Sequence, residues 1–218
     1  RERSRDPKSI LNEINKLKEN GYKEITLLGQ NVDSYLWYGG GLKKDFNKAN
    51  IIQKRTAINF AKLLDLVAKC YPDFRIRFTT SNPQDMDIEV LTTMQTHSNI
   101  CNHIHLPVQS GSNKILKAMN RQHTREEYLN LISNIKKILP NCGISQDIIT
   151  GFPNETEKDH LDTLSLMELV KYDFGFMFKY SERPGTLAAR KMKDNITEKV
   201  KQRRLSEIID LQFQHSYK

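Results

Sequence analysis

The sequence predicts an α/β protein built on a parallel sheet whose strands are joined by helices. The order of apolar runs along the chain predicts this class. Short apolar runs typical of buried strands alternate with longer runs whose apolar residues recur at helical spacing. This order is that of parallel strands with helical crossovers, in a sheet that either stays open or curls into a barrel. The 218 residues suffice for one substantial core, and no repeat or boundary interrupts them, so we expect a single domain over residues 1–218.

The first helix and the first strand are expected within the first thirty residues. Pro7 suits a helix start, apolar residues recur at helical spacing over residues 10–17, and an Asn-Gly pair at 20–21 ends the helix. Residues 23–28 then form a short buried strand, which runs directly into Gly-Gln-Asn at 29–31.

Residues 32–55 are the least regular part of the chain. They include three consecutive glycines, the only tryptophan and scattered lysines. Loops of this length in compact domains are usually functional or disordered, and we expect a partly ordered surface loop here. The glycines at 39–41 indicate loop flexibility rather than a phosphate cradle, because the chain has no Walker loop and no GxGxxG after a strand.

The rest of the chain continues the alternation. A period of two predicts a strand over 74–79, in which Phe74, Ile76 and Phe78 share one face. Further strands are expected from His103, over 143–150 and over 173–180. Helices are expected around 60–67 and 85–96, from Gly111 to about Met119, over 124–139 and 155–170, and from Ile196 onward.

Small polar residues and glycines follow the strands at one end. In parallel α/β folds, ligands bind at the carboxyl ends of the strands. The polar segments there are 29–31, 79–82, 109–112, Asp147 with Gly151 and Phe152, and 180–181. Gly29, Gly111 and Gly151 would let the backbone approach a ligand closely. We therefore expect one ligand site at this end of the sheet.

Alternation along the strands predicts which side chains line that site. If the apolar face of 74–79 packs on helices, then Arg75, Arg77 and Thr79 point to the other side. The same reasoning adds side chains from the later strands: His103, His105, Gln109, Ser145, Asp147 and Lys179. Such a lining suits a zwitterionic or anionic ligand, and a buried network of salt bridges and hydrogen bonds is the alternative.

His103 and His105 allow another interpretation. A His-x-His pair on one strand face can hold a metal ion, as in some barrel hydrolases. That chemistry needs ligands from other strands, and only Asp147 is an evident candidate. We therefore favour two histidines hydrogen-bonded inside the fold, with a metal-dependent hydrolase as an alternative.

Charge and cysteine content bear on the partners and the compartment. The formal net charge of +8 indicates an anionic partner, nucleic acid first, although a solvated lysine-rich surface would give the same charge. A non-catalytic RNA-binding module that uses this surface alone is thus a further alternative. Cys70, Cys101 and Cys142 are far apart and odd in number, which argues against a disulfide framework. Without a signal peptide or a long apolar run, we expect a cytoplasmic protein.

Five motifs at the strand ends resemble those of the radical S-adenosylmethionine (SAM) methylthiotransferases. They are, in chain order, LLGQNVDSY at 27–35, RFTTSNP at 77–83, HLPVQSGS at 105–112, DIITGFPNET at 147–156 and SERPGT at 181–186. The similarity covers nearly the whole chain. Within the family, GQNV and TTSNP are similar to members that act on N6-dimethylallyladenosine in tRNA, rather than on a ribosomal protein or threonylcarbamoyladenosine.

The resemblance implies a partial parallel β/α barrel and radical SAM chemistry in the parent protein. Such enzymes carry two four-iron four-sulfur clusters: one, held by three cysteines, reduces SAM to a deoxyadenosyl radical, and one in an N-terminal domain supplies sulfur. The radical attacks a modified adenosine beside the tRNA anticodon, and a second SAM supplies the methyl group. The implied partners of this transferase are tRNA and an electron donor. The resemblance also implies a monomeric protein that does not associate with membranes.

This chain departs from the family pattern in what it lacks. The CxxxCxxC loop and the first barrel strand are expected just upstream of Arg1, and the N-terminal cluster domain and the C-terminal RNA-binding domain are absent from the sequence. None of the three cysteines matches a cluster ligand. We therefore expect a radical SAM core fragment that binds no cluster and is inactive by itself. A smaller departure is Asn154, where the family usually has glycine.

The resemblance also implies roles by position for SAM. Gln30 and Asn31 look like the segment that meets the amino-acid part of SAM, and Gln109 and Ser110 like the strand that meets its ribose. The stretch from Asp147 through Gly151 to Phe152 resembles the strand that flanks its adenine.

The same resemblance implies a general location for four further residues. Thr79 and Ser81 are expected to line the SAM pocket, and Tyr35 and Arg183 to lie on the RNA side. No catalytic residue is expected within the fragment. Each of these positions could instead be structural, since Gly-Phe-Pro and Arg-Pro-Gly are also good turn sequences.

Overall fold

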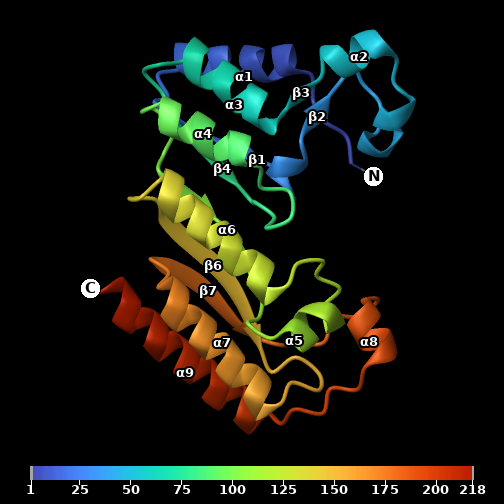
Figure 1. Ribbon diagram of the computed structural model, residues 1–218, viewed down its shortest axis with the longest axis vertical. Helices are drawn as coiled ribbons and strands as arrows, with labels where there is room; N and C mark the ends of the chain where they lie inside the picture. The colour runs from blue at the N-terminus through green and yellow to red at the C-terminus, as the bar shows by residue number, and fades with distance from the viewer. Residues whose placement is uncertain (1, 218) are drawn as a thin grey trace. The chain divides into compact units, whose positions relative to one another are not determined.

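The computed structural model describes residues 2–217, and they pack as two compact units. Unit 1 comprises Arg1–His103 with Lys137–Asn141, and unit 2 comprises Ile104–Lys136 with Cys142–Lys218. Both units are drawn in Figure 1. The expectation of a single domain over residues 1–218 stays a prediction.

Unit 1 is built around two parallel strands, β1 (Glu24–Leu28) and β4 (Arg75–Thr79), paired with Ile25 opposite Ile76. Helices α1 (Pro7–Glu19), α3 (Phe60–Cys70) and α4 (Ile88–Thr96) belong to the same unit. Helix α1 begins as predicted, with Pro7 at its first turn and the Asp6 side chain accepting a hydrogen bond from the Lys8 amide. These elements confirm the helix–strand order expected from the sequence.

The alternation predicted for residues 74–79 sets the two faces of β4. Ile76 and Phe78 are buried, whereas Arg75 is exposed and Arg77 is half-buried. The Phe78 ring packs edge-on against Phe60 of α3, with ring centroids 5.2 Å apart. Burial of one such side chain contributes roughly 1.5–3 kcal/mol. On the other face, Arg77 pairs with Glu24 of β1 at 3.0 Å.

Residues 32–59 are more regular than the expected loop. They form the 3-10 helices η1 (Val32–Ser34) and η2 (Lys43–Lys48), the helix α2 (Ile51–Arg55), and the antiparallel strands β2 (Leu36–Trp37) and β3 (Ile58–Asn59). These pieces are too short to show apolar periodicity, and a side-chain cap is found at α2 but not at η1 or η2. Asn50 and Gln53 make a reciprocal capping box at the start of α2. The three glycines at 39–41 all adopt positive φ, which accounts for their presence in the turn.

Unit 2 contains a parallel sheet of β5 (His103–His105), β6 (Gly143–Thr150) and β7 (Phe174–Lys179), in that spatial order. Its helices are α5 (Asn113–Ala118), α6 (Arg125–Ile138), α7 (Glu157–Val170), α8 (Leu187–Lys191) and α9 (Glu198–Ser216). Helix α9 packs against β7 and α7, as Figure 1 shows. The crossovers between these strands confirm the predicted α/β class.

The two faces of this sheet differ in polarity. Asp147 of β6 is paired in register with Phe176 of β7, so both lie on the same face, together with Phe174 and Phe178. These three phenylalanines are exposed. Lys179, which we expected on this face, lies on the other one, where it pairs with Glu198 of α9 at 2.8 Å. The expected shared face was wrong because the register pairs Asp147 with Phe176 and so puts Asp147 on the face of the phenylalanines, although Lys179 and Asp147 still line the same pocket.

Candidate functional site

Unit 2 contains a pocket of about 590 Å³ beside the carboxyl ends of β6 and β7. Six residues expected at the ligand site line it: Gln109, Asp147, Phe152, Lys179, Tyr180 and Ser181. Arg183, expected on the RNA side, lines it as well. The remaining lining comes mainly from apolar side chains such as Ile149 and Phe178, and from the segments around α5 and α8. The pocket thus joins the Asp147 carboxylate, amide groups and several cationic side chains to aromatic and aliphatic surface.

The backbone fixes Gln109 at this pocket. Its amide donates to the Asp147 carbonyl at 2.8 Å, and its own carbonyl accepts from the Ile149 amide at 3.0 Å. Gln109 adopts a left-handed conformation, with φ of 72°. That conformation is unfavourable for a residue other than glycine by roughly 1–2 kcal/mol, and the two hydrogen bonds to β6 offset it.

Asp147 faces His105 across the sheet. His105 Nε2 lies 3.5 Å from the Asp147 carboxylate, and its Nδ1 is 2.9 Å from the Ser145 hydroxyl. The His105 ring also packs edge-on against Phe176. This arrangement fits the hydrogen-bonded interpretation of His105. Within residues 2–217, no group of three or more His, Cys, Asp or Glu side chains is arranged to hold a metal ion.

The Gly-Phe-Pro turn is shaped by contacts inside the protein. Gly151 has φ of 72°, and a side chain there would overlap Lys201 of α9. The Gly151 amide donates to Glu155 at 2.7 Å, and Glu155 forms a buried ion pair with Arg204 at 2.8 Å. Phe152 packs edge-on against Tyr180. The need for glycine at 151 therefore has an internal cause, and the role of Gly151 at a cofactor stays a prediction.

Ser110 is turned toward helix α7 and does not line the pocket. Its hydroxyl lies 3.3 Å from Thr163 Oγ1 and accepts from the Ser112 amide. A side chain on the neighbouring Gly111 would overlap the backbone of Asp162 and Thr163. Gly111 is thus required by the close approach of the turn to α7, a cause different from the ligand approach that we expected.

Unit 1 contains a pocket of about 520 Å³ lined by Gln30, Asn31 and Tyr35, by β1 and by α1. The Asn31 amide group donates to Asp85 at 2.6 Å. Tyr35, assigned to the RNA side, donates to the Arg5 carbonyl at 2.7 Å, and burial raises the pKa of its hydroxyl well above the usual value. Gln30 and Asn31 therefore lie at a cavity of unit 1, and their role at a ligand stays a prediction.

Thr79 and Ser81 do not line this pocket, and Ser81 is engaged by a residue that the sequence analysis missed. The Ser81 hydroxyl donates to Asp33 at 3.4 Å, and the Asn82 amide donates to the other Asp33 oxygen at 3.0 Å. Burial raises the pKa of Asp33 to about 7, against the opposite effect of these hydrogen bonds. The signal was the carboxylate within the LLGQNVDSY motif.

Arg121 is a second residue missed from the sequence. It lines the pocket of unit 2, and burial lowers the pKa of its guanidinium while the Asp147 carboxylate opposes this effect. A cation and an anion thus face the same pocket. The only sequence signal was an arginine in the turn after the short helix that we expected to end near Met119.

The candidate residues fall into two groups. Gln30, Asn31, Thr79 and Ser81 belong to unit 1, and the group from Gln109 to Phe152 belongs to unit 2. Their convergence on one SAM site stays a prediction.

Curated relatives match this chain along almost its whole length. It is 71% identical over 216 residues to tRNA-2-methylthio-N(6)-dimethylallyladenosine synthase of Christiangramia forsetii, and 66% identical over 217 residues to the enzyme of that name in Flavobacterium psychrophilum. These matches cover 99% and 100% of this chain but 45% of each relative. The chain therefore spans about half the length of the relatives that it matches.

Two solved structures show the same fold at low identity. Coproporphyrinogen III oxidase from Escherichia coli, described as a radical SAM enzyme, aligns with a TM-score of 0.57 and 22% identity, over 72% of this chain and 38% of the other. Methylornithine synthase aligns with a TM-score of 0.59 and 15% identity, over 96% of this chain and 53% of the other. The partial β/α barrel class predicted from the sequence is thereby confirmed.

The profile of the Radical SAM superfamily matches residues 1–167, more than three quarters of the chain. This chain therefore belongs to the radical SAM superfamily.

Proposed function

We propose that this chain is the central part of a tRNA methylthiotransferase, which adds a methylthio group to N6-dimethylallyladenosine by radical SAM chemistry. The observation that carries the proposal is the 66–71% identity, along nearly the whole chain, to the two curated enzymes with that activity in their names. The aligned region covers 99–100% of this chain and so spans all five strand-end motifs.

The residues of this chain fit SAM in chemical type. In unit 2, Phe152 and Ile149 offer apolar surface for an adenine, while Asp147 and the Gln109 amide offer hydrogen-bonding groups for a ribose. In unit 1, Gln30 and Asn31 offer amide groups for the charged amino-acid end. SAM, when bound and reduced, supplies the radical that starts the reaction. These residues would bind and orient it.

The cysteines of this chain do not fit a four-iron four-sulfur cluster. Cys70 is exposed, whereas Cys101 and Cys142 are half-buried. Burial raises the pKa of the Cys142 thiol to about 12, so it stays protonated and is a poor ligand. The cluster ligands belong to the CxxxCxxC loop that the family resemblance implies. That the fragment alone binds no cluster and is inactive stays a prediction.

The inferred partners are the anticodon-loop adenosine of tRNA and an electron donor. The net charge of +8 supports an RNA partner. Among residues 2–217, no helix combines the length and the apolarity that crossing a bilayer requires. We infer a cytoplasmic, monomeric transferase. A non-catalytic RNA-binding module remains the competing function supported by the charge, whereas the hydrogen bonds of His105 disfavour a hydrolase built on His103 and His105.

The test uses the full-length protein that contains this chain, with its clusters reconstituted, and tRNA carrying dimethylallyladenosine. Mass spectrometry of the digested tRNA is expected to show the methylthio nucleoside. Asp147→Asn should lower kcat/KM by roughly 10- to 100-fold, the size of one lost charge-assisted hydrogen bond. Asp210→Asn, an exposed position on α9, is the control and should leave the rate unchanged. Absence of product from a fully loaded enzyme would refute the proposal in favour of the RNA-binding module.

A further inference from the structure

The segment from β2 to β3, residues 36–59, carries half of the net positive charge of the chain. It contains five basic side chains and one acidic side chain, a net charge of +4, against +8 for all 218 residues. The five cations are Lys43, Lys44, Lys48, Lys54 and Arg55. We refer to residues 36–59 as the β2–β3 segment.

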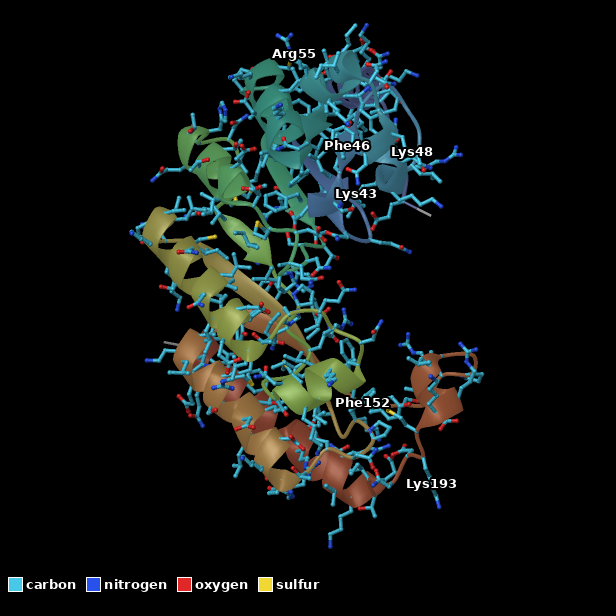
Figure 2. All side chains as sticks on the ribbon, turned by 45° about the vertical axis from the view of Figure 1, so that its right-hand side comes forward. Lys43, Phe46, Lys48, Arg55, Phe152 and Lys193 are labelled. Atoms are coloured by element: carbon cyan, nitrogen blue, oxygen red, sulfur yellow. The ribbon has the colours of Figure 1, made fainter. Side chains whose placement is uncertain are left out.

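Acidic neighbours neutralise only part of this charge. Lys43 lies 3.6 Å from Asp85, and Lys48 lies 3.2 Å from Asp45, yet the Lys48 side chain is 82% exposed. Pairs this exposed add little stability and can exchange for another anion. Lys44 and Arg55 are exposed, and neither has an ion-pair partner among residues 2–217. Figure 2 shows the side chains of Lys48 and Arg55 extending from the segment.

The segment is held in place by its own hydrogen bonds. Leu36 and Asn59 pair across its base, and the Asn59 side chain donates to Glu89 of α4 at 2.9 Å. Tyr38 is buried, its hydroxyl donates to the Leu42 carbonyl at 2.8 Å, and its ring packs against Phe46. The cations are therefore displayed on a built surface rather than on a flexible tail, which lowers the entropic cost of binding a ligand.

Apolar side chains accompany the cations. Ile51 and Ile52 on α2 are 71% and 69% exposed, directly before Lys54 and Arg55. Cations for phosphates together with apolar surface for sugars and bases are what single-stranded or looped RNA requires. The segment also adjoins the pocket of unit 1, since the Leu36 amide donates to Ser4 and the Lys43 amide to the Glu2 carbonyl, and both Ser4 and Glu2 line that pocket.

We propose that the β2–β3 segment binds the phosphate backbone of the tRNA substrate, with Lys44 and Arg55 as its principal phosphate-binding side chains. The inference rests on the proposed function and deepens it by naming a surface of unit 1 that holds the RNA. Lys48 joins this surface once phosphate replaces Asp45 as its partner.

The test measures binding of tRNA carrying dimethylallyladenosine to the full-length protein at several salt concentrations. Lys44→Glu with Arg55→Glu should weaken binding about tenfold near physiological salt, and should reduce the slope of log Kd against log salt by roughly 1–2. The matched control is Lys16→Glu with Lys18→Glu, the same charge change at exposed positions on α1. It should leave binding within about twofold of the wild type. Thermal melting of each variant verifies folding.

The outcomes separate the two claims. If the wild type modifies tRNA but both double variants bind it equally well, the inference is overturned and the proposed function stands. If the control weakens binding as much as Lys44→Glu with Arg55→Glu, the attraction comes from overall charge and the inference is again overturned. If the wild type neither binds nor modifies tRNA, the proposed function fails as well.

Discussion

The Asp33 carboxylate accepts a hydrogen bond from the backbone amide of Asn82, 3.0 Å away. Asp33 follows β1 and Asn82 follows β4, so this contact ties together the two loops that carry the Gly-Gln-Asn and Thr-Thr-Ser-Asn-Pro motifs. Burial of the Asp33 side chain, together with the nearby Asp85 carboxylate, raises the pKa of Asp33 and so favours its protonated form.

A pH dependence of stability follows from this preference. The folded-state pKa of Asp33, about 7, lies above the ordinary 3.8, so the folded chain binds the proton more tightly than the unfolded chain. Its contribution to the free energy of unfolding is complete below about pH 4 and is lost as the pH rises through 7. Asp33→Asn keeps an acceptor for the Asn82 amide but does not titrate.

Between pH 5 and pH 8 the wild type should lose about 1 kcal/mol of unfolding free energy relative to Asp33→Asn. This is roughly half of the value that the pKa shift gives for this pH window, because the side chain retains some solvent. Urea titrations of this chain at both values measure the difference. Asp210→Asn should show no such trend, and an equal trend in both variants would contradict the assignment to Asp33.

Arg204 is expected to be essential to the stability of unit 2. It is buried with Glu155, with side chains 5% and 2% exposed, and Arg204→Met would leave that carboxylate without its cationic partner. Loss of one member of a buried pair costs about 3–5 kcal/mol. Denaturant titration measures this loss, which should grow with pH because the burial that already raises the pKa of Glu155 would act unopposed by Arg204.

The neighbouring Arg203 supplies the matched control, because it pairs with Glu157 and Glu207 on the exposed side of the same helix. Arg203→Met should have only a small effect. Glu155→Gln combined with Arg204→Met should recover part of the loss. If the two arginine substitutions lowered the free energy of unfolding equally, the buried pair would matter no more to stability than the exposed pairs.

Gly111→Ala should destabilise the chain by about 2 kcal/mol or more, since the added methyl group would overlap the backbone of α7. Gly29→Ala is the comparison: Gly29 does not adopt positive φ, and a methyl group there would meet its nearest atom at 3.4 Å. Thermal melting of both variants tests the point. If Gly111→Ala melts like the wild type, the glycine is not required by packing.

Metal content provides a test of the hydrolase alternative. We expect the isolated chain to carry no stoichiometric zinc, and chelator treatment to leave its melting temperature unchanged, because both His105 nitrogens have partners in Ser145 and Asp147. Elemental analysis after purification without chelators is the measurement. One zinc per chain, lost on His105→Ala, would favour the hydrolase.

Local pattern predicted most of the secondary structure. Strand β4 and helix α1 follow from the spacing of their apolar residues and from Pro7, because burial of one face is a property that a short stretch of sequence records. Residues 32–59 escaped such analysis, since their helices and strands are two to six residues long and too short to show a period. The face of β7 that Asp147 shares depends on the register of two strands, so alternation within β7 could not place Lys179 relative to Asp147.

The sequence by itself determined the α/β class, the strand-end motifs and, through them, the superfamily. Only the tertiary structure decided that Gly111 and Gly151 are required by α7 and α9, that Asp33 joins two loops, and that Arg121 shares a pocket with Asp147. The reason is physical: a pattern along the chain records which face of an element is buried, whereas close approaches between elements depend on side chains distant in sequence, which only folding brings together.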